Sequence, residues 1–230
     1  MEGVVGSNGL IVPPDDYWPA VREICDKYGI LLISDEVMSG WGRTGRWFAV
    51  DHWGVVPDII TTAKGITSGY IPLGAVIVSE KIADFFEDKY LYAGLTYSGH
   101  ALSCAAALAT IEVYEQENLI ENAQKMGDYL GEALEALKLR HACIGDVRYI
   151  GLFSTIELVL NRETKEIMPP SVMAEVGSIL RQHGLFTFIM ANSMGSMLFI
   201  VPPLCITTAQ LDDGLAIVEK ALSAADQYVQ

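Results

Sequence analysis

Residues 30–35 read Ile-Leu-Leu-Ile-Ser-Asp, a continuous apolar run that ends in an acidic residue. Two further runs follow along the chain, Asp58-Ile-Ile-Thr-Thr-Ala-Lys64 and Gly74-Ala-Val-Ile-Val-Ser79. Continuous apolar runs of this length are typical of parallel strands that are covered on both faces. Because helical patterns lie before and after these runs, the sequence predicts an α/β domain.

Two helices flank this predicted sheet. Residues 17–28 place apolar side chains at three- and four-residue steps, the pattern of an amphipathic helix. We expect Asp16 to cap the start of this helix, Pro19 to fit its first turn and Gly29 to end it. A second, alanine-rich helix is predicted over about residues 100–117, and we expect it to be closely packed.

A smaller α+β domain is predicted to begin at Asn118. Asn118 and Glu121 form a capping-box pattern, and one apolar stripe follows to about residue 138. Residues 185–211 carry no charge and are long enough to span a bilayer, but a polar turn and two prolines favour a pair of short buried strands. The other expected elements are strands near 152–160 and 197–201 and helices near 172–183 and 209–225, the last with Thr207 and Gln210 as a second capping pair.

The composition excludes several classes of function. The chain has 230 residues and a formal net charge of −14, which argues against nucleic acid and anionic membranes as partners. The cysteines and histidines lack zinc-ligand spacing, so we expect no metal site. Cys104 lies in an apolar helical stretch, where a free cysteine is usually buried. Because no secretory signal opens the chain, a cytoplasmic protein is expected.

Asp35 and Lys64 each end one of the predicted apolar strands. In open α/β sheets ligands bind beyond the carboxyl ends of the strands, so a carboxylate and an amine could meet one ligand there. Taken alone, each residue is more simply explained as a solvent-facing charge. Lys64, however, lies in a stretch with little other charge, and apolar surroundings let a lysine lose its proton more readily.

Several segments together carry a family resemblance. The central ones are Ile33-Ser-Asp-Glu-Val-Met-Ser-Gly-Trp-Gly-Arg-Thr-Gly45, Pro57-Asp-Ile-Ile-Thr-Thr-Ala-Lys-Gly65 and Gly69-Tyr-Ile-Pro-Leu-Gly-Ala75. They resemble the signature of class III aminotransferases, which are fold-type-I enzymes that use pyridoxal 5′-phosphate (PLP). The resemblance continues nearly to the end of the chain through Thr96-Tyr-Ser-Gly-His100, Gly145-Asp-Val-Arg148 with Gly151-Leu152, and Pro202-Pro-Leu-Cys-Ile-Thr207.

The resemblance implies a fold and a reaction. Residues 1–117 correspond to the C-terminal part of a large PLP-binding domain with a mostly parallel, three-layer sheet, and residues 118–230 to a small C-terminal α+β domain. The implied reaction moves an amino group from an amine or ω-amino acid donor to a 2-oxo acid such as pyruvate. The implied partners are a second copy of the chain in a homodimer or a separate N-terminal half.

The resemblance also assigns roles to residues. Lys64 forms a Schiff base with PLP and later moves a proton, and Asp35 pairs with the pyridinium nitrogen, which makes the ring a better electron sink. Val37 lies against the ring face, and Thr96 reaches the phosphate of the neighbouring subunit's cofactor. Glu2 matches an acidic residue of the family's Glu-Pro-Val segment, although Gly3 replaces the proline here.

A competing motif overlaps this signature. Gly40-Trp-Gly-Arg-Thr-Gly45 satisfies G-x-G-x-x-G, the dinucleotide-binding fingerprint. That fingerprint needs a strand directly before it and a helix directly after it, whereas Asp35-Glu36 precede it and no helical pattern follows. A tight loop between two elements explains these glycines more simply.

The chain departs from the family pattern in two ways. The family's chains are about twice as long, and their first half carries a phosphate-binding turn and an aromatic residue that stacks on the cofactor. We therefore expect the sheet to have an uncovered apolar face and the chain alone to have no aminotransferase turnover. Two alternatives to an aminotransferase remain open: a catalytically inactive subunit that acts as a folding or interaction partner, and an enzyme with another fold-type-I reaction. In addition, residues 186–195 lack the arginine that binds a substrate carboxylate in many relatives, which favours amine donors.

Overall fold

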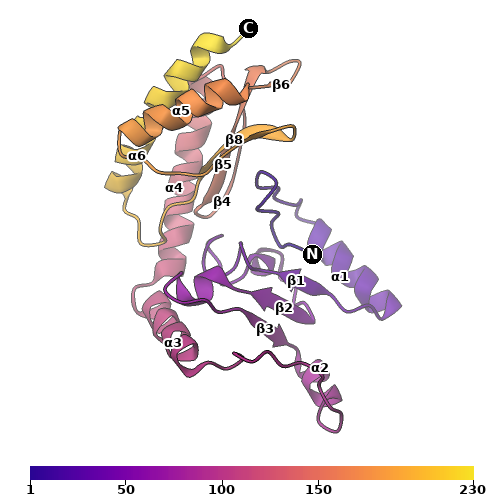
Figure 1. Cartoon of the computed structure of the whole chain (residues 1–230). Coiled ribbons are helices and arrows are strands. Elements are labelled where there is room, and N and C mark those ends of the chain that lie inside the picture. The colour runs from indigo at the N-terminus through magenta and orange to yellow at the C-terminus, as the bar shows by residue number, and fades with distance from the viewer. The chain divides into compact units, whose positions relative to one another are not determined.

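The computed structural model describes residues 1–230 and divides into two compact units (Figure 1). The first unit contains residues 1–4 and 13–120, and the second contains residues 5–12 and 121–230. Each unit has its own sheet and its own helices.

The first unit is built around a three-stranded sheet in the order β1-β2-β3. β1 runs parallel to β2, with Asp35 opposite Thr61, and β2 runs antiparallel to β3, with Thr62 opposite Ala75. The antiparallel pairing follows from the β2–β3 connection, which contains only a 3-10 turn and lacks the helical crossover that a parallel pair needs. Its elements are α1 (Tyr17–Tyr28), β1 (Ile33–Asp35), η1 (Ala49–Trp53), β2 (Ile59–Thr62), η2 (Lys64–Thr67), β3 (Ala75–Val78), α2 (Glu80–Phe85) and α3 (Ala101–Gln116).

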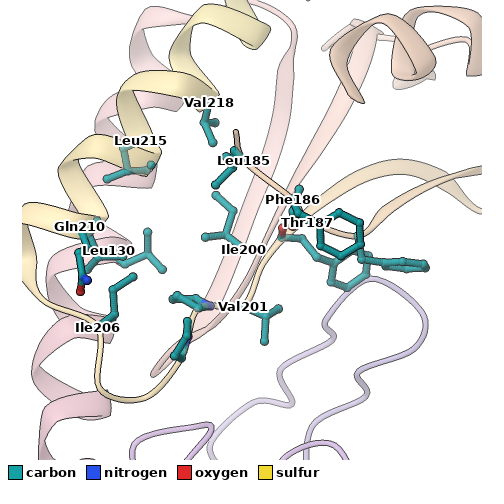
Figure 2. A pocket seen from close by; sticks show the side chains of 16 residues that line it. Leu130, Leu185, Phe186, Thr187, Ile200, Val201, Ile206, Gln210, Leu215 and Val218 are labelled. Carbon is teal, nitrogen blue, oxygen red and sulfur yellow. Dashed lines mark hydrogen bonds between the residues drawn. The ribbon is translucent and has the colours of Figure 1, made fainter. Parts of the chain in front are cut away.

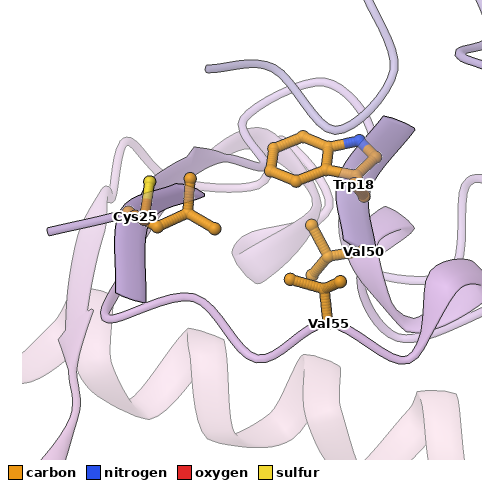
Figure 3. Close-up of a cluster of buried hydrophobic side chains, with 5 residues drawn as sticks. Trp18, Cys25, Val50 and Val55 are labelled. Carbon is orange, nitrogen blue, oxygen red and sulfur yellow. The ribbon is translucent and has the colours of Figure 1, made fainter. Parts of the chain in front are cut away.

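Helix α1 has the predicted bounds and covers a small hydrophobic cluster (Figure 3). The cluster contains Trp18, Cys25, Leu32, Val50 and Val55, all buried. Gly29 ends the helix with a left-handed φ of 63°, as its sequence position predicts. The expected cap at the other end is wrong: the Asp16 side chain makes no capping hydrogen bond, because its φ of −87° and ψ of −10° are already helical.

Helix α3 is not closely packed, contrary to expectation. Only three of its side chains are buried within the first unit, and Leu102 and Leu108 are 64% and 63% exposed. Cys104 is exposed as well, so its expected place in the core is also wrong. The expected uncovered apolar face is confirmed, since Val76 and Val78, which share one face of strand β3, are 66% and 42% exposed.

The second unit contains an antiparallel sheet in the order β4-β5-β8-β7, with β6 paired to β5. The β7–β8 hairpin is the predicted strand pair of residues 185–211, and its register joins Asn192 to Gly195. None of the helices is both long and apolar enough to cross a bilayer. The elements are α4 (Leu119–Arg140), β4 (Ile144–Ile150), β5 (Phe153–Asn161), β6 (Glu166–Ile167), α5 (Pro170–Gln182), β7 (Ile189–Asn192), β8 (Gly195–Ile200), α6 (Thr208–Ala225) and η3 (Asp226–Tyr228).

Two glycines of helix α4 let it approach strand β4 and the turn that follows this strand. A Cβ atom at Gly131 would lie 2.2 Å from the Tyr149 ring, and one at Gly127 would lie 2.3 Å from the backbone of Gly151. Most of the predicted apolar stripe of α4 is buried as well. The predicted cap at Asn118 is wrong, because this residue has a φ of 51° and joins α3 to α4 in the left-handed conformation.

The opposite face of strand β4 carries Arg148, since neighbouring side chains of a strand alternate. Its Nε donates to the carbonyl oxygens of Gly9 and Leu10 at 2.9 and 3.1 Å. Its Nη1 forms ion pairs with Asp146 and Glu157 at 2.9 and 2.6 Å. Arg148 therefore ties residues 5–12 to this sheet, although the sequence pattern did not predict β4 as a strand.

Candidate active site

Lys64 lies just after the carboxyl end of strand β2 in the first unit. Strand β2 ends at Thr62, and Lys64 begins the 3-10 helix η2 with a φ of 47°. This left-handed conformation is disfavoured for a residue with a Cβ atom by about 1–2 kcal/mol. The side chain is exposed, and its amine makes no hydrogen bond or ion pair within the chain. The lysine therefore occupies a strained backbone position with its amine free to react, a combination that points to a functional site.

Lys64 and Thr96 line the same cavity, which has a volume of about 1000 Å³. The two residues are far apart in sequence, and both are exposed. Hydroxyl groups and glycine backbone face the same space, so the cavity offers both an amine and hydrogen-bonding groups for an anion. The other lining residues are Thr67, Gly69, Ile71, Pro72, Leu73, Gly74, Leu95, Tyr97, Ser98 and Gly99.

Asp35 ends strand β1 next to β2, but the structure does not bring Asp35 or Val37 into the lining of this cavity. The register places Asp35 opposite Thr61, three residues before Lys64 along the neighbouring strand. Its Oδ1 accepts a hydrogen bond from the backbone N–H of Val37 at 3.0 Å, which holds the half-buried carboxylate. The backbone of Glu2 forms an isolated parallel bridge with Asp35, so Glu2 lies at the same sheet edge.

Glu36 follows Asp35 and is fully buried, although sequence reasoning assigned it no role. Its carboxylate accepts hydrogen bonds from the backbone N–H groups of Ala49 and Val50, each at 3.0 Å. The hydroxyls of Ser34 and Ser39 donate to it as well. Burial raises the pKa of Glu36, and these hydrogen bonds oppose the rise. Glu36 thus fastens the loop after β1 to the start of η1.

Trp41 and Tyr114 enclose the backbone beside Lys64, and sequence reasoning missed both. The Trp41 Nε1 donates to Thr62 Oγ1 at 2.5 Å, and the Tyr114 hydroxyl donates to the Gly65 carbonyl at 2.7 Å. The two rings are stacked, with centroids 6.3 Å apart and planes inclined by 18°. Tyr114 lies on α3, far along the chain from Gly65, so no local sequence signal could have paired them.

The loop that contains Trp41 has the geometry of a tight turn. Gly42 and Gly45 have φ values of 85° and 84°, which favour glycine, and the next helix is the short η1 rather than an α-helix. The strand–turn–helix order of a dinucleotide site is therefore missing. Burial lowers the pKa of Arg43 in this loop to about 10, and burial raises the pKa of Tyr114 while Arg43 opposes that rise.

The sequence profile of the family described as "Aminotransferase class-III" matches residues 1–222. The chain belongs to this family. The taurine–pyruvate aminotransferase of Bilophila wadsworthia is 41% identical over 99% of this chain and 52% of its own length. The putrescine–pyruvate aminotransferase of Pseudomonas aeruginosa is 39% identical over 96% of this chain and 48% of its own length.

A solved aminotransferase structure has the same fold as the chain. The taurine:2-oxoglutarate aminotransferase of Bifidobacterium kashiwanohense, in complex with PLP and glutamate, superposes with a TM-score of 0.94 at 44% identity. The match covers 100% of this chain and 52% of that protein. The fold is therefore the α/β fold of fold-type-I transaminases, and the chain spans about half the length of the relatives it matches.

Class III aminotransferases are PLP-dependent, and the residues of this chain fit that cofactor. A PLP site needs a lysine with a free amine, a carboxylate for the ring nitrogen and hydrogen-bond donors for the phosphate. Lys64 offers the free amine, Asp35 offers a carboxylate at the same sheet edge, and Thr96 offers a hydroxyl in the Lys64 cavity. No group of three or more His, Cys, Asp or Glu side chains is arranged to hold a metal ion.

A second cavity, of about 440 Å³, lies within the second unit of this class III chain (Figure 2). It is lined mostly by apolar side chains from α4, α6 and the segments that flank the β7–β8 hairpin, among them Leu130, Leu185, Ile200 and Val218. Phe186 and Phe188, which belong to the segment that lacks the expected arginine, line this cavity, whereas Met190 does not. None of the lining residues is charged.

Proposed function

We propose that the protein to which this chain belongs is a PLP-dependent aminotransferase. It moves an amino group from an amine or ω-amino acid donor to a 2-oxo acid such as pyruvate. The observation that carries this proposal is Lys64, whose free amine opens into the larger cavity from a left-handed backbone at the end of β2. Family membership and the names of the relatives support the reaction type.

Each site residue of this chain has a separate task in the proposal. Lys64 would hold PLP through Nζ and would hold or move a proton at that atom. Asp35 would accept a hydrogen bond from the protonated ring nitrogen, Val37 would cover one ring face, and Thr96 would donate to the phosphate of the neighbouring subunit's PLP. When bound, PLP supplies the electron sink that stabilises negative charge on the carbon bearing the amino group.

We propose that this chain alone binds PLP weakly and does not turn over. Lys64 and Thr96 are both exposed, so residues outside these 230 would have to exclude water from the site. Residues 1–117 would form part of the large PLP-binding domain and residues 118–230 the small domain. A homodimer or a pairing with an N-terminal half would complete the site, and free cysteines support a cytoplasmic location.

A second candidate function is a catalytically inactive subunit that acts as a folding or interaction partner. The exposed apolar side chains of β3 and α3 favour it, because such surfaces are normally covered by another part of a protein. The two candidates differ at Lys64, which the first uses and the second does not.

The test that separates them is covalent trapping. The chain, alone and with the N-terminal half of a close relative, is incubated with PLP, reduced with borohydride and mapped by peptide mass spectrometry. We expect the label at Lys64, with turnover only in the complemented sample. Lys64→Ala should abolish the label, whereas Lys125→Ala, which removes an exposed lysine of the second unit, should not. A label on other lysines with Lys64 unmodified would favour the inactive subunit.

The donor preference is a further prediction of the proposed function. Residues 185–211 contain no lysine or arginine. Burying the α-carboxylate of a substrate without a cation costs several kcal/mol of binding free energy. A rise of about 1.4 kcal/mol in the activation free energy already slows a reaction tenfold. We therefore expect the complemented enzyme to prefer amines and ω-amino donors, the class of donor for which the taurine and putrescine relatives are named. The measurement is kcat/KM for a donor panel at fixed pyruvate. Higher values for alanine and glutamate than for every amine would contradict the prediction.

A further inference from the structure

We propose that Trp41 and Tyr114 are positioning residues that fix the backbone of Lys64 and so aim its amine at the cavity. The proposal rests on the proposed function of Lys64 and adds residues that act through it. Neither aromatic residue lines the cavity, and each acts on Lys64 through the backbone or side chain of its neighbours Thr62 and Gly65.

Tyr114 holds the residue that follows Lys64. Its hydroxyl donates to the Gly65 carbonyl at 2.7 Å, and the side chain is buried. The same carbonyl accepts the backbone N–H of Ser68 at 3.1 Å, which closes the turn of η2. The Gly65 peptide is therefore held by two donors, one local and one from helix α3 at a sequence distance of 49 residues.

Trp41 holds the chain on both sides of Lys64. Its indole Nε1 donates to Thr62 Oγ1 at 2.5 Å, two residues before the lysine. On the other side, a Cβ atom at position 65 would lie 2.5 Å from the Trp41 Cβ atom, so the tryptophan packs directly on Gly65. Stacking of Trp41 on Tyr114 joins the two sets of contacts into one clamp.

The left-handed backbone of Lys64 explains why a clamp is needed. A residue with a Cβ atom keeps a φ of 47° only when its surroundings hold it there. The Lys64 side chain contributes no hydrogen bond or ion pair of its own, so the neighbours Thr62 and Gly65 must supply the restraint. Trp41 and Tyr114 contact these two neighbours and leave the amine free.

The test uses Tyr114→Phe in the 230-residue chain, which removes the hydroxyl and keeps the ring. Hydrogen exchange of the Ile66 and Ser68 amides, whose acceptors are the Ala63 and Gly65 carbonyls, reports on the η2 turn without any cofactor. We expect about tenfold faster exchange, which corresponds to about 1.4 kcal/mol. The rate of borohydride trapping of PLP on Lys64 should fall about tenfold, while labelling of Lys125 stays unchanged.

Two further variants define the result. Trp41→Phe removes the hydrogen bond to Thr62 and should change exchange and trapping in the same direction. Tyr129→Phe removes a tyrosine hydrogen bond of similar length, 2.6 Å to Asp212, within the second unit and should change neither. Tyr114→Phe and Tyr129→Phe keep the whole ring, whereas Trp41→Phe also removes buried volume, so only a change that Tyr114→Phe shares is attributed to the clamp.

Two outcomes would overturn the proposal, and a third would overturn the proposed function on which it rests. Unchanged exchange at Ile66 and Ser68 in both clamp variants would mean that the pair does not fix the backbone. Faster exchange with unchanged trapping at Lys64 would mean that the clamp stabilises the fold but does not aim the amine. If neither the parent chain nor its complemented form is trapped at Lys64, the proposed function fails, and the exchange rates at Ile66 and Ser68 decide separately whether Trp41 and Tyr114 fix the backbone.

Discussion

Glu36 is a wholly buried carboxylate whose loss should be costly. Glu36→Ala would leave the backbone N–H groups of Ala49 and Val50 without an acceptor, together with two serine hydroxyls. Because each buried donor without a partner costs about 1–3 kcal/mol, we expect the free energy of unfolding to fall by about 3 kcal/mol or more. Urea denaturation followed by tryptophan fluorescence measures this loss. Glu23→Ala, at an exposed position of α1, should stay within about 0.5 kcal/mol of the parent.

The same carboxylate should make stability depend on pH with a defined sign. Burial raises the pKa of Glu36, so the folded chain binds this proton more tightly than the unfolded chain does. The contribution of protonated Glu36 to the free energy of unfolding is therefore complete below the pKa of glutamate in the unfolded chain, about 4.3. It is lost as the pH rises through the pKa of Glu36 in the folded chain. The free energy of unfolding of the parent minus that of Glu36→Gln should decrease as the pH rises from 4. A difference that is constant between pH 4 and pH 8 would contradict this.

Helix α1 is tied to the sheet by Asp58, and this contact should show the opposite pH dependence. Asp58 Oδ2 accepts from Arg22 Nη1 at 2.9 Å and from the Leu32 N–H at 2.7 Å. Burial works against the charge, but these hydrogen bonds and the Arg22 guanidinium lower the pKa of Asp58 overall. The stabilisation is therefore present above the unfolded pKa of about 3.9 and is lost as the pH falls through the folded pKa.

Asp58→Ala should accordingly lower the free energy of unfolding by about 2 kcal/mol near pH 7. The substitution removes a charged acceptor and leaves its two donors, Arg22 and the Leu32 N–H, without this partner. The loss should shrink as the pH falls towards 3, which urea denaturation at several pH values would detect. Asp15→Ala, a change at an exposed carboxylate just before α1, serves as the control. If the cost of Asp58→Ala is the same at pH 3 and pH 7, the charge of Asp58 is not what ties α1 to the sheet.

The chain as a whole exposes apolar surface that a monomer would normally cover. Strand β3 is an edge strand, and its alternate residues Val76 and Val78 are 66% and 42% exposed. Edge strands of this kind pair with other chains unless charges block them. We expect the chain to self-associate with rising concentration and Val76→Lys with Val78→Lys to reduce this, as measured by sedimentation velocity. Leu139→Lys, at an 88% exposed leucine at the end of α4, should leave association unchanged.

Local patterns predicted much of the fold, and the errors have a common cause. The bounds of α1, the Thr207–Gln210 capping box and the strand pair in residues 185–211 are confirmed because periodicity and caps are encoded within a few residues. The predicted caps at Asp16 and Asn118 are wrong, since a cap also depends on backbone angles that the residue type alone does not set. The predicted burial of α3 is wrong, because burial depends on what covers a helix.

The sequence by itself determined the family, the α/β class and the two strand ends at which Asp35 and Lys64 stand. These features depend on motifs and periodicities that are read within short windows of the chain. Only the tertiary structure decided that Lys64 is left-handed, that Trp41 and Tyr114 hold its neighbours and that Glu36 collects its four donors. The physical reason is that these contacts join residues far apart along the chain, as with Tyr114 and Gly65, and such contacts leave no periodic trace in the sequence.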